Sequence, residues 1–497
     1  MSDKCDLLIK DAQAVIPKIG ITKTNILIED GKIKNLSSSI DGIEYTASVN
    51  ANNRYVLPGL IDPHVHYGVF SPIEIASETE SRTAALGGVT TIMRMLRVYE
   101  PYTQEIEKQL QGSVNNHYID YQIHASILNP QQVSDIPHLH KSGIRSFKLY
   151  MNLGSTDNRI LMDMYPSQNN HLPRNVNITD ELCFQVLSAC SSLKNTTVLV
   201  HAEDNSTCAR IIEEKKKESL GHANKSNSRE EIKADQKDEK NLKTDTAENY
   251  NPLKVWSECR PPISEEIAIK KIMKMGRELR SNIYFVHIGS NHALNTILNE
   301  RQLGGCNAYI ETCPHYLTHS IDYSNLRGKV VPPLRTKNDI ASLWNAIKNG
   351  LVDTIGTDHV ANTLALKYGQ KGDIWTALAG FPGLATMLPV LLHYGVIQRN
   401  IPLTQIAELS SYNAAKIFGF YPKKGTIQKG SDADLVIIDL EISKKVTPEL
   451  LQSSSDYTIY DGMELQGWPT VTISRGKIIM ENETVYQHNK GHGKFLK

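Results

Sequence analysis

The sequence predicts an α/β protein in which a (β/α)8, TIM-like barrel carries a small β-sandwich domain built from both chain termini. Two observations predict the barrel. The chain has 497 residues, enough to bury a large core, and apolar runs alternate with helical patterns through its middle, as in a parallel sheet. A third observation predicts the smaller domain, because short strand-like runs with turns occupy both ends of the chain.

Several apolar runs in the middle region have the length and composition of buried strands. They are LIDPHVH, GVTTIMRML, DYQIHASI, SFKLYM, TVLVHAE, NIYFVHI, NAYIET and VDTIGTD. Helical patterns fit between most of them, such as IEIASETESRTAAL, DELCFQVLSACSSL, SEEIAIKKIMKMGREL and NDIASLWNAIKNG. The repetition favours a barrel over an open doubly wound sheet, the structural alternative, and no GxGxxG follows the first strand.

The two ends of the chain resemble each other in pattern. Near the N-terminus, DLLIKDAQAVI and NILIEDGKIKNL read as strands, and Asp30-Gly31 between alternating apolar residues is a hairpin signal. Near the C-terminus, KGSDADLVIIDL and VTISRGKIIMEN read in the same way. We therefore expect residues 1–57 and 418–497 to form one small β domain and residues 58–417 to form the barrel.

One segment of the barrel region departs from this rhythm. Residues 213–249 are dominated by Lys, Glu, Asp and Asn, and they hold too few apolar side chains to sit in a core. We expect a solvated helical excursion or a mobile loop. A lid or a subunit contact is the alternative.

Composition restricts the partners. Lysine plus arginine and aspartate plus glutamate number 54 each, so no charge excess points to nucleic acid or to an anionic membrane, and a small-molecule substrate is expected. No signal sequence and no apolar span of about twenty residues is present, so we expect a cytoplasmic protein. The seven cysteines are scattered without a CxxC pair, so any metal must be held by histidine and oxygen ligands.

Polar side chains gather where the predicted strands end, the edge at which barrel enzymes carry their catalytic groups. His64 and His66 end the first strand and, two residues apart, point to the same face. The others are Lys148 on the fourth strand, His201 on the fifth, His287 on the sixth and Asp358 on the eighth. Each has a structural explanation, such as a buried core histidine or a helix-capping aspartate, but their coincidence in one ring predicts a functional site.

Three further histidines lie near strand ends. They are His124, His315 and His359, and we expect them to support the ring or to contact substrate.

A series of motifs runs through nearly the whole chain. In order, they are GLIDPHVH, AALGGVTT, SFKLYM, LVHAEDN, RPPISEE, FVHIGS, ETCPHYL, PPLR, GTDH and NAAKIFGFYPKKGTIQKGSDADLVIID. In content and order the motifs resemble the cyclic amidohydrolases of the dihydropyrimidinase and hydantoinase group, relatives of allantoinase and dihydroorotase.

The resemblance implies a hydrolase that uses two divalent metal ions. It makes His64 and His66 ligands of the more buried metal, and His201 and His287 ligands of the more exposed one. Lys148 matches the lysine that reacts with CO2 to give a carbamate bridging both metals, and Asp358 matches the aspartate that binds the buried metal and handles the proton. Such ligands suit zinc, although cobalt, manganese or nickel fit the same set.

The resemblance is less specific about the ring that is opened. Hydantoinases and dihydropyrimidinases carry a tyrosine five residues after the bridging lysine, where it binds the tetrahedral intermediate; here that position is Leu153. The arginine of the dihydroorotase HxHxR motif is replaced by Gly68, and Arg97 aligns with the asparagine that its relatives carry. ETCPHYLTHS and DIWTALAGFPGLATMLP lean toward allantoinase and archaeal-type dihydroorotases, although Ala385 stands where many relatives have Glu.

The function expected from these residues is the opening of a cyclic amide, a dihydropyrimidine, hydantoin or similar ureide, to an N-carbamoyl acid. Expected substrate contacts are Arg97, His315, Val331 and Ala379. Allantoinase or dihydroorotase activity is the alternative within the family, and a non-catalytic scaffold is the alternative of another class. In scaffold relatives the metal ligands are substituted. This chain keeps all six ligand residues, so an enzyme is favoured. The resemblance also implies a homodimer or homotetramer.

Overall fold

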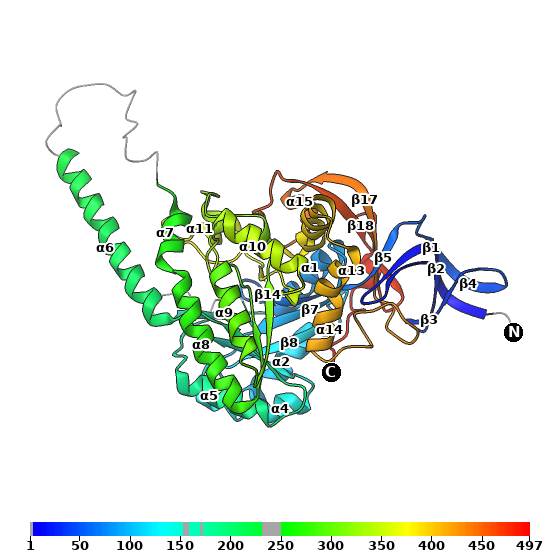
Figure 1. Cartoon of the computed structure of the whole chain (residues 1–497), viewed down its shortest axis with the longest axis horizontal. Coiled ribbons are helices and arrows are strands. Elements are labelled where there is room, and N and C mark those ends of the chain that lie inside the picture. The colour runs from blue at the N-terminus through cyan, green and yellow to red at the C-terminus, as the bar shows by residue number, and fades with distance from the viewer. Residues whose placement is uncertain (1–2, 153–158, 169–171, 231–249) are drawn as a thin grey trace, which may run out of the picture.

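Two nine-stranded sheets organise the molecule (Figure 1). One is parallel and comes from the middle of the chain; the other is mostly antiparallel and comes from both ends. The computed structural model describes residues 3–152, 159–168, 172–230 and 250–497. None of its described helices is both long and apolar enough to cross a membrane.

The parallel sheet curves until its two ends are neighbours in the sequence. In spatial order its strands are β15 (Thr354–Ile355), β14 (Asn307–Thr312), β13 (Asn282–Phe285), β12 (Thr197–His201), β9 (Ser146–Tyr150), β8 (Asp120–Ser126), β7 (Val89–Leu96), β6 (Leu60–His66) and β16 (His359–Val360). β15 pairs with β14 and β16 pairs with β6, so residues 354–360, which begin within the last predicted strand, contact both ends of the sheet. That strand is broken, because Asp358 has a left-handed φ of 49° that no extended strand accommodates. The barrel is therefore only partly closed.

Helices connect these strands and pack on their outer side, which confirms the α/β prediction (Figure 1). They are α1 (Ile73–Leu86), α2 (Tyr102–Ser113), α3 (Pro130–Val133), α4 (Ile136–Lys141), α5 (Asp180–Ser191), α6 (Asn205–Glu230), α7 (Pro252–Cys259), α8 (Pro262–Leu279), α9 (Asn291–Gln302) and α10 (Lys337–Lys348). Shorter helices follow: α11 (Leu364–Tyr368), α12 (Met387–Val390), α13 (Leu403–Ala407), α14 (Asn413–Ile417) and α15 (Pro448–Leu451).

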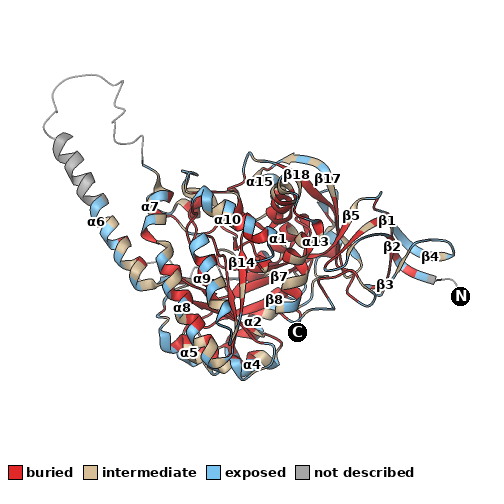
Figure 2. Ribbon diagram, viewed as in Figure 1, coloured by how far each residue is buried: buried red, intermediate tan, exposed pale blue. Residues whose placement is uncertain are grey.

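An apolar plug fills the barrel interior beneath the strand ends. Every residue of β6 and β7 is buried, as expected for parallel strands that are covered on both faces (Figure 2). The interior cluster includes Ile61, Met93, Leu199 and Tyr284, and Phe418 packs against it from the end of α14. This packing makes the strand ends a rigid platform, on which side-chain positions are well defined.

The ends of the chain form one continuous sheet. Its strands run β20 (Thr484–Val485), β19 (Lys477–Glu481), β18 (Glu464–Ser474), β17 (Leu435–Lys445), β5 (Tyr55–Pro58), β1 (Asp3–Ile16), β2 (Gly20–Glu29) and β3 (Lys32–Ser37), with β4 (Ile43–Asn50) paired to β1. The predicted pairing of the two termini is confirmed, since β17 lies antiparallel to β5. That pairing joins the two halves edge to edge in one mostly antiparallel sheet. The Asp30-Gly31 hairpin is present, with φ of 50° and 74°.

The charged segment begins as a helix. α6 runs from Asn205 to Glu230 and stands out from the body of the molecule, as Figure 1 shows at the upper left. Residues 213–230 of the segment are thus helical, in line with the expected excursion, and residues 231–249 lie outside the described part of the chain.

Candidate metal centre

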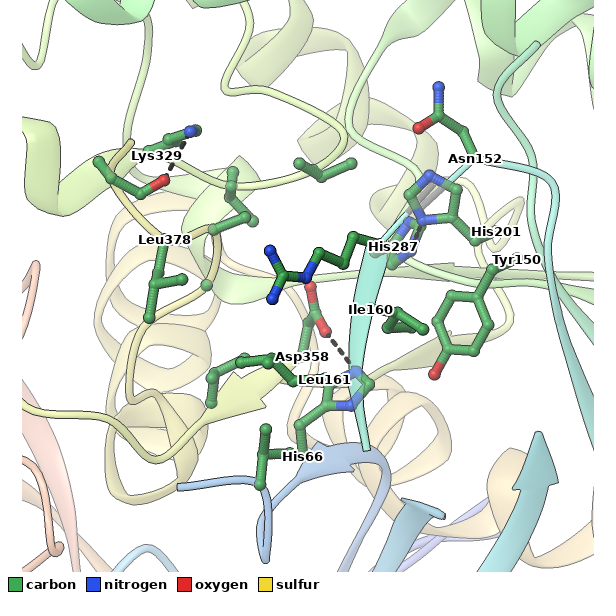
Figure 3. Close-up of a pocket in the computed structure, with 18 of the residues that line it drawn as sticks. His66, Tyr150, Asn152, Ile160, Leu161, His201, His287, Lys329, Asp358 and Leu378 are labelled. Carbon is green, nitrogen blue, oxygen red and sulfur yellow. Dashed lines mark hydrogen bonds and ion pairs between the residues drawn. The ribbon is translucent and has the colours of Figure 1, made fainter. Parts of the chain in front are cut away.

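The ring of polar residues predicted from the strand ends converges on one pocket of about 510 Å³ (Figure 3). His64 and His66 come from β6, Lys148 from β9 and His201 from the end of β12. His287 follows β13, and Asp358 lies between β15 and β16. All of them line the pocket, and each is at most 8 % exposed.

Asp358 and two histidines form the first group in this pocket. Asp358 Oδ1 lies 3.3 Å from His64 Nε2 and 3.2 Å from His66 Nε2. Burial lowers the pKa of both imidazoles well below its ordinary value, so they are neutral and keep a lone pair for a cation. The three ligand atoms lie within 4.8 Å of one another, a spacing suited to a single metal ion.

The other two histidines form a second group beside the first. His201 Nδ1 lies 3.0 Å from His287 Nε2, and the His287 ring centre lies 5.4 Å from that of His64. The pKa of His287 is also lowered well below its ordinary value, mainly by burial. Two neutral imidazoles at this distance share one hydrogen bond, and a cation held by both nitrogens would replace it.

Lys148 lies in the same pocket without a hydrogen-bond partner for its amine. The side chain is fully buried, and Nζ has no acceptor among the described residues. Burial lowers the pKa of this amine to about 7, so much of it is neutral near neutral pH. A neutral, buried amine is the species that reacts with CO2, and the resulting carbamate would supply the anionic oxygen ligand that the His201–His287 pair lacks.

Two buried carboxylates orient the histidines from behind. Glu311 Oε1 accepts a hydrogen bond from His64 Nδ1 at 2.7 Å, and burial raises the pKa of Glu311 to about 8. Glu203 Oε2 lies 2.7 Å from His201 Nε2, and its other oxygen accepts from Arg260 Nε at 3.1 Å. Each carboxylate leaves the opposite ring nitrogen directed at the pocket, the arrangement typical of metal-binding histidines.

The loop that carries Asp358 is tied to the first strand. Asp62 Oδ1 accepts hydrogen bonds from the backbone N–H groups of His64 and Thr357, both at 3.1 Å. Asp62 Oδ2 accepts from Thr357 Oγ1 at 2.6 Å. Asp358 and His287 both have left-handed φ angles, 49° and 45°. Such backbone is strained for residues with a Cβ and is held by its surroundings, as is common at functional sites.

The expected substrate contacts divide into two sets. Arg97, Val331 and Ala379 line the pocket. His315 is buried instead, with its ring 5.0 Å from that of Phe381, and it is absent from the described lining residues. Leu153 lies outside the described part of the chain.

The remaining strand-end histidines are held by hydrogen bonds away from the pocket. His124 lies between Ser146 Oγ at 2.6 Å and the Pro63 carbonyl at 2.9 Å. His359 Nε2 lies 2.9 Å from Glu80 Oε2. Their contacts support the strands that carry the ring.

Sequence reasoning missed the two orienting carboxylates. Glu311 ends β14, and Glu203 lies two residues after His201. A count of acids at strand ends, in addition to histidines, would have found both.

Comparison with known proteins agrees with this geometry. Residues 55–479 match the model of the amidohydrolase family. The chain belongs to the amidohydrolase family. A D-hydantoinase of Geobacillus stearothermophilus is 30% identical to it, over 99% of this chain and 96% of the relative. An L-hydantoinase of Paenarthrobacter aurescens is 28% identical over 99% and 98%.

Solved structures are similar to this amidohydrolase over nearly its whole length. The L-hydantoinase (dihydropyrimidinase) from Arthrobacter aurescens superposes with a TM-score of 0.83 at 26% identity, covering 99% of this chain and all of the relative. A dihydropyrimidinase from Brevibacillus agri gives a TM-score of 0.80 at 25% identity.

Proposed function

We propose that this amidohydrolase opens a cyclic amide ring, a dihydropyrimidine, hydantoin or similar cyclic ureide, to an N-carbamoyl acid. The observation that carries the proposal is the convergence of His64, His66, His201, His287, Lys148 and Asp358 on one pocket. Relatives named hydantoinases and dihydropyrimidinases match the chain from end to end, which supports the same ring chemistry.

We assign the ligands in two sets. His64 and His66 would hold the more buried metal ion together with Asp358, and His201 and His287 would hold the more exposed one. A carbamate on Lys148 would bridge them, and this is supported by an Nζ that no described residue hydrogen-bonds. Imidazole and oxygen donors without a thiolate favour Zn²⁺ for both positions. Bound divalent ions in such a site polarise the amide carbonyl and lower the pKa of a water molecule to about 7.

The protein residues supply positioning and proton transfer. Asp358 Oδ1, beside two neutral imidazoles, would accept the proton of the attacking water and return it to the leaving amide nitrogen. Glu311 and Glu203 keep His64 and His201 in the required tautomer.

The wall of the pocket would position the ring. The segment 375–380 lies there beside Val331. It is fastened by Lys367 Nζ, which donates to the carbonyls of Lys329 and Gly380, both at 2.7 Å. Ala379 and Val331 are thus set on backbone that cannot easily shift, and we propose that they contact the ring.

We further propose that residues 58–417 form the catalytic domain, that residues 1–57 and 418–497 form the supporting one, and that the protein assembles as a homodimer or homotetramer. A dihydroorotase of the HxHxR type is disfavoured. Gly68, at the arginine position, has φ +87°, and a Cβ there would lie 2.9 Å from Arg94 Nη2.

The test is ring opening by metal-loaded protein offered dihydrouracil, hydantoin, a 5-substituted hydantoin, allantoin and dihydroorotate. The control is Asp358→Asn, since asparagine tolerates the left-handed φ of this position. We expect ring opening by the wild type, and a kcat about 10²- to 10⁴-fold lower in the variant with most metal retained. Full turnover by the variant would refute the proton-transfer role, and no turnover with bound metal would favour a scaffold.

A further inference from the structure

The pocket lining carries several basic side chains in addition to the proposed metal ligands. Besides Lys148, its described lining includes four cationic side chains, Arg97, Arg159, Lys216 and Lys329. They come from separate elements: the end of β7, β10 (Arg159–Met162), α6 and the turn after residues 326–328. Among the described residues of the lining, Asp358 is the single carboxylate.

Arg97 is the best-positioned of these cations. Its Nε lies 3.5 Å from Asp163 Oδ1, and its carbonyl accepts a hydrogen bond from the Asp163 N–H at 2.9 Å. Arg94 binds the other oxygen of that carboxylate through Nε at 3.1 Å and Nη2 at 2.7 Å. One buried carboxylate therefore serves two guanidinium groups, and the closer contacts go to Arg94.

The exposed fractions of the two arginine side chains also differ. The Arg94 side chain is 1% exposed, whereas that of Arg97 is 13% exposed and lines the pocket. Arg97 is thus fixed in place by a contact that leaves part of its positive charge available to a bound molecule.

Lysines line the pocket on α6 and beside the 375–380 segment. Ile212 and Lys216 lie one turn apart on α6, so one face of the helix contributes both to the lining. Lys329 Nζ donates to the Ala377 carbonyl at 2.6 Å (Figure 3), and burial lowers its pKa to about 7. Lys329 therefore mainly holds the wall.

We propose that the substrate is a cyclic amide whose ring substituent carries a carboxylate, and that Arg97 binds this carboxylate. The inference rests on the proposed ring-opening function. A guanidinium binds a carboxylate through two parallel hydrogen bonds, among the strongest pairings available to a side chain. A neutral substituent of the same size would leave the partly buried charge of Arg97 half compensated, so the pocket selects against it. Arg159 and Lys216 strengthen the attraction at longer range.

The test compares two nearly isosteric rings, racemic hydantoin-5-acetate and hydantoin-5-acetamide, on metal-loaded protein. Steady-state kinetics give kcat and KM for each ring. Calorimetry on the Asp358→Asn protein gives the binding of each intact ring without turnover. The variant is Arg97→Gln, and the matched control is Arg174→Gln, a half-exposed arginine that pairs with Glu100 at 3.3 Å and is not among the described lining residues.

We expect the acid to bind about 10- to 100-fold more tightly than the amide, since hydrogen bonds to charged groups are the strong ones. In Arg97→Gln the ratio of the two affinities should fall close to one, because KM for the acid rises while KM for the amide changes little. Arg174→Gln should keep the preference. Equal binding of the two rings by the wild type, or an undiminished preference in Arg97→Gln, would overturn the inference.

The two measurements separate this inference from the proposed function. Rings that are opened without preference for the acid would leave the function standing and refute the anionic substrate. An acid that binds through Arg97 but is not opened would support the anion site, and it would refute the function if no ring of the larger panel is opened either. Failure of both rings to bind would refute the anionic substrate, and the larger panel would then decide the function.

Discussion

Glu311 accepts a hydrogen bond from His64 Nδ1 at 2.7 Å, and the same oxygen accepts the backbone N–H of His287 at 2.9 Å. One buried carboxylate therefore fixes a residue of each histidine group. Its second oxygen accepts from the Tyr284 hydroxyl at 2.8 Å, so the carboxylate cannot rotate away. A cation bound nearby would also favour its ionised form, against the pKa of about 8 that burial imposes.

Replacing Glu311 with Gln should weaken metal binding by about 10- to 100-fold, the usual cost of losing an orienting carboxylate behind a ligand histidine. Glutamine keeps the volume but has only one acceptor oxygen, so its NH2 group must face either the N–H groups of His64 and His287 or the Tyr284 hydroxyl. Metal affinity is measured by competition with a chelating indicator. Glu105→Gln is the control, because Glu105 is also buried but lies on the outer helix α2. Unchanged affinity in the Glu311 variant would show that His64 is oriented without it.

Replacing Lys148 with Ala should lower the metal content well below that of the wild type, because the bridging anion is lost. A short carboxylic acid such as acetate fits the space left by the carbamate and should restore part of the metal and of the activity. Elemental analysis with and without acetate measures the effect. Full metal occupancy in the variant before any acid is added would rule out a bridge at this position.

The carbamate itself should be visible by NMR in protein supplied with isotopically labelled bicarbonate. Three buried lysines have a lowered pKa, to about 7 for Lys148 and Lys329 and well below the ordinary value for Lys367, so each could react on the ground of pKa. They differ in that Lys329 Nζ and Lys367 Nζ donate to backbone carbonyls, whereas Lys148 Nζ has no acceptor among the described residues. The signal should vanish in Lys148→Ala and persist in Lys329→Met. The reverse pattern would contradict the assignment.

The strand ends could be read from the sequence because parallel strands are short, apolar and bounded by polar residues. His64, His201 and His287 each follow such a run, and the barrel topology then dictates that they meet. Glu311 and Glu203 also lie near strand ends. A lone acid at such a position is equally typical of a helix cap, so it does not by itself predict a site.

Other features depend on contacts between segments distant in the sequence. Nothing local in the run VDTIGTD announces the left-handed φ of Asp358 that breaks the strand, because Asp62 and neighbouring strands impose it. The register of the β17–β5 pairing, with Leu435 opposite Pro58, also depends on segments far apart in the chain. His315 is predicted to support the ring or to contact substrate, and only the fold shows that its buried ring lies 5.0 Å from that of Phe381.

Gly68 should be needed for both its backbone and its space. Its φ is +87°, and an added Cβ would lie 2.9 Å from Arg94 Nη2. Gly42 is a matched control, with φ +72° and no atom within 4 Å of an added Cβ. Gly42→Ala should cost about 1–2 kcal/mol of unfolding free energy from backbone strain. Gly68→Ala should cost more, because the Arg94–Asp163 pair must also shift. Denaturant midpoints measure the difference. Equal losses of unfolding free energy would mean that the Arg94 side chain moves aside at no cost.

A buried ion cluster joins the barrel to the terminal sheet at the N-terminal ends of the strands, away from the metal centre. Lys424 Nζ lies 2.8 Å from Asp120 Oδ2 at the start of β8, 3.3 Å from Asp432 Oδ2, and also binds Asp434 just before β17. The three aspartates resemble a cation site, and the ammonium supplies the positive charge. Burial opposes the ionisation of Asp120, but Lys424 and Arg475 outweigh it and lower its pKa below the ordinary value.

Lys424→Met should therefore cost about 3–5 kcal/mol of unfolding free energy at neutral pH, because it leaves buried carboxylates without their cation. Lys423→Met is the control: its side chain is 62% exposed, its Nζ lies 4.0 Å from Asp432, and its loss should cost at most about 1 kcal/mol.

A lowered carboxyl pKa stabilises the fold above the unfolded value of about 4, and that stability is lost as pH falls through the folded pKa. Burial raises the pKa of Asp434, so protonation begins there and ends with Asp120. The gap between wild type and Lys424→Met should thus narrow as pH falls below about 4, and urea unfolding between neutral pH and about pH 2 measures it. A gap that stays constant over this range would mean that packing of the lysine stem, rather than its charge, stabilises the junction.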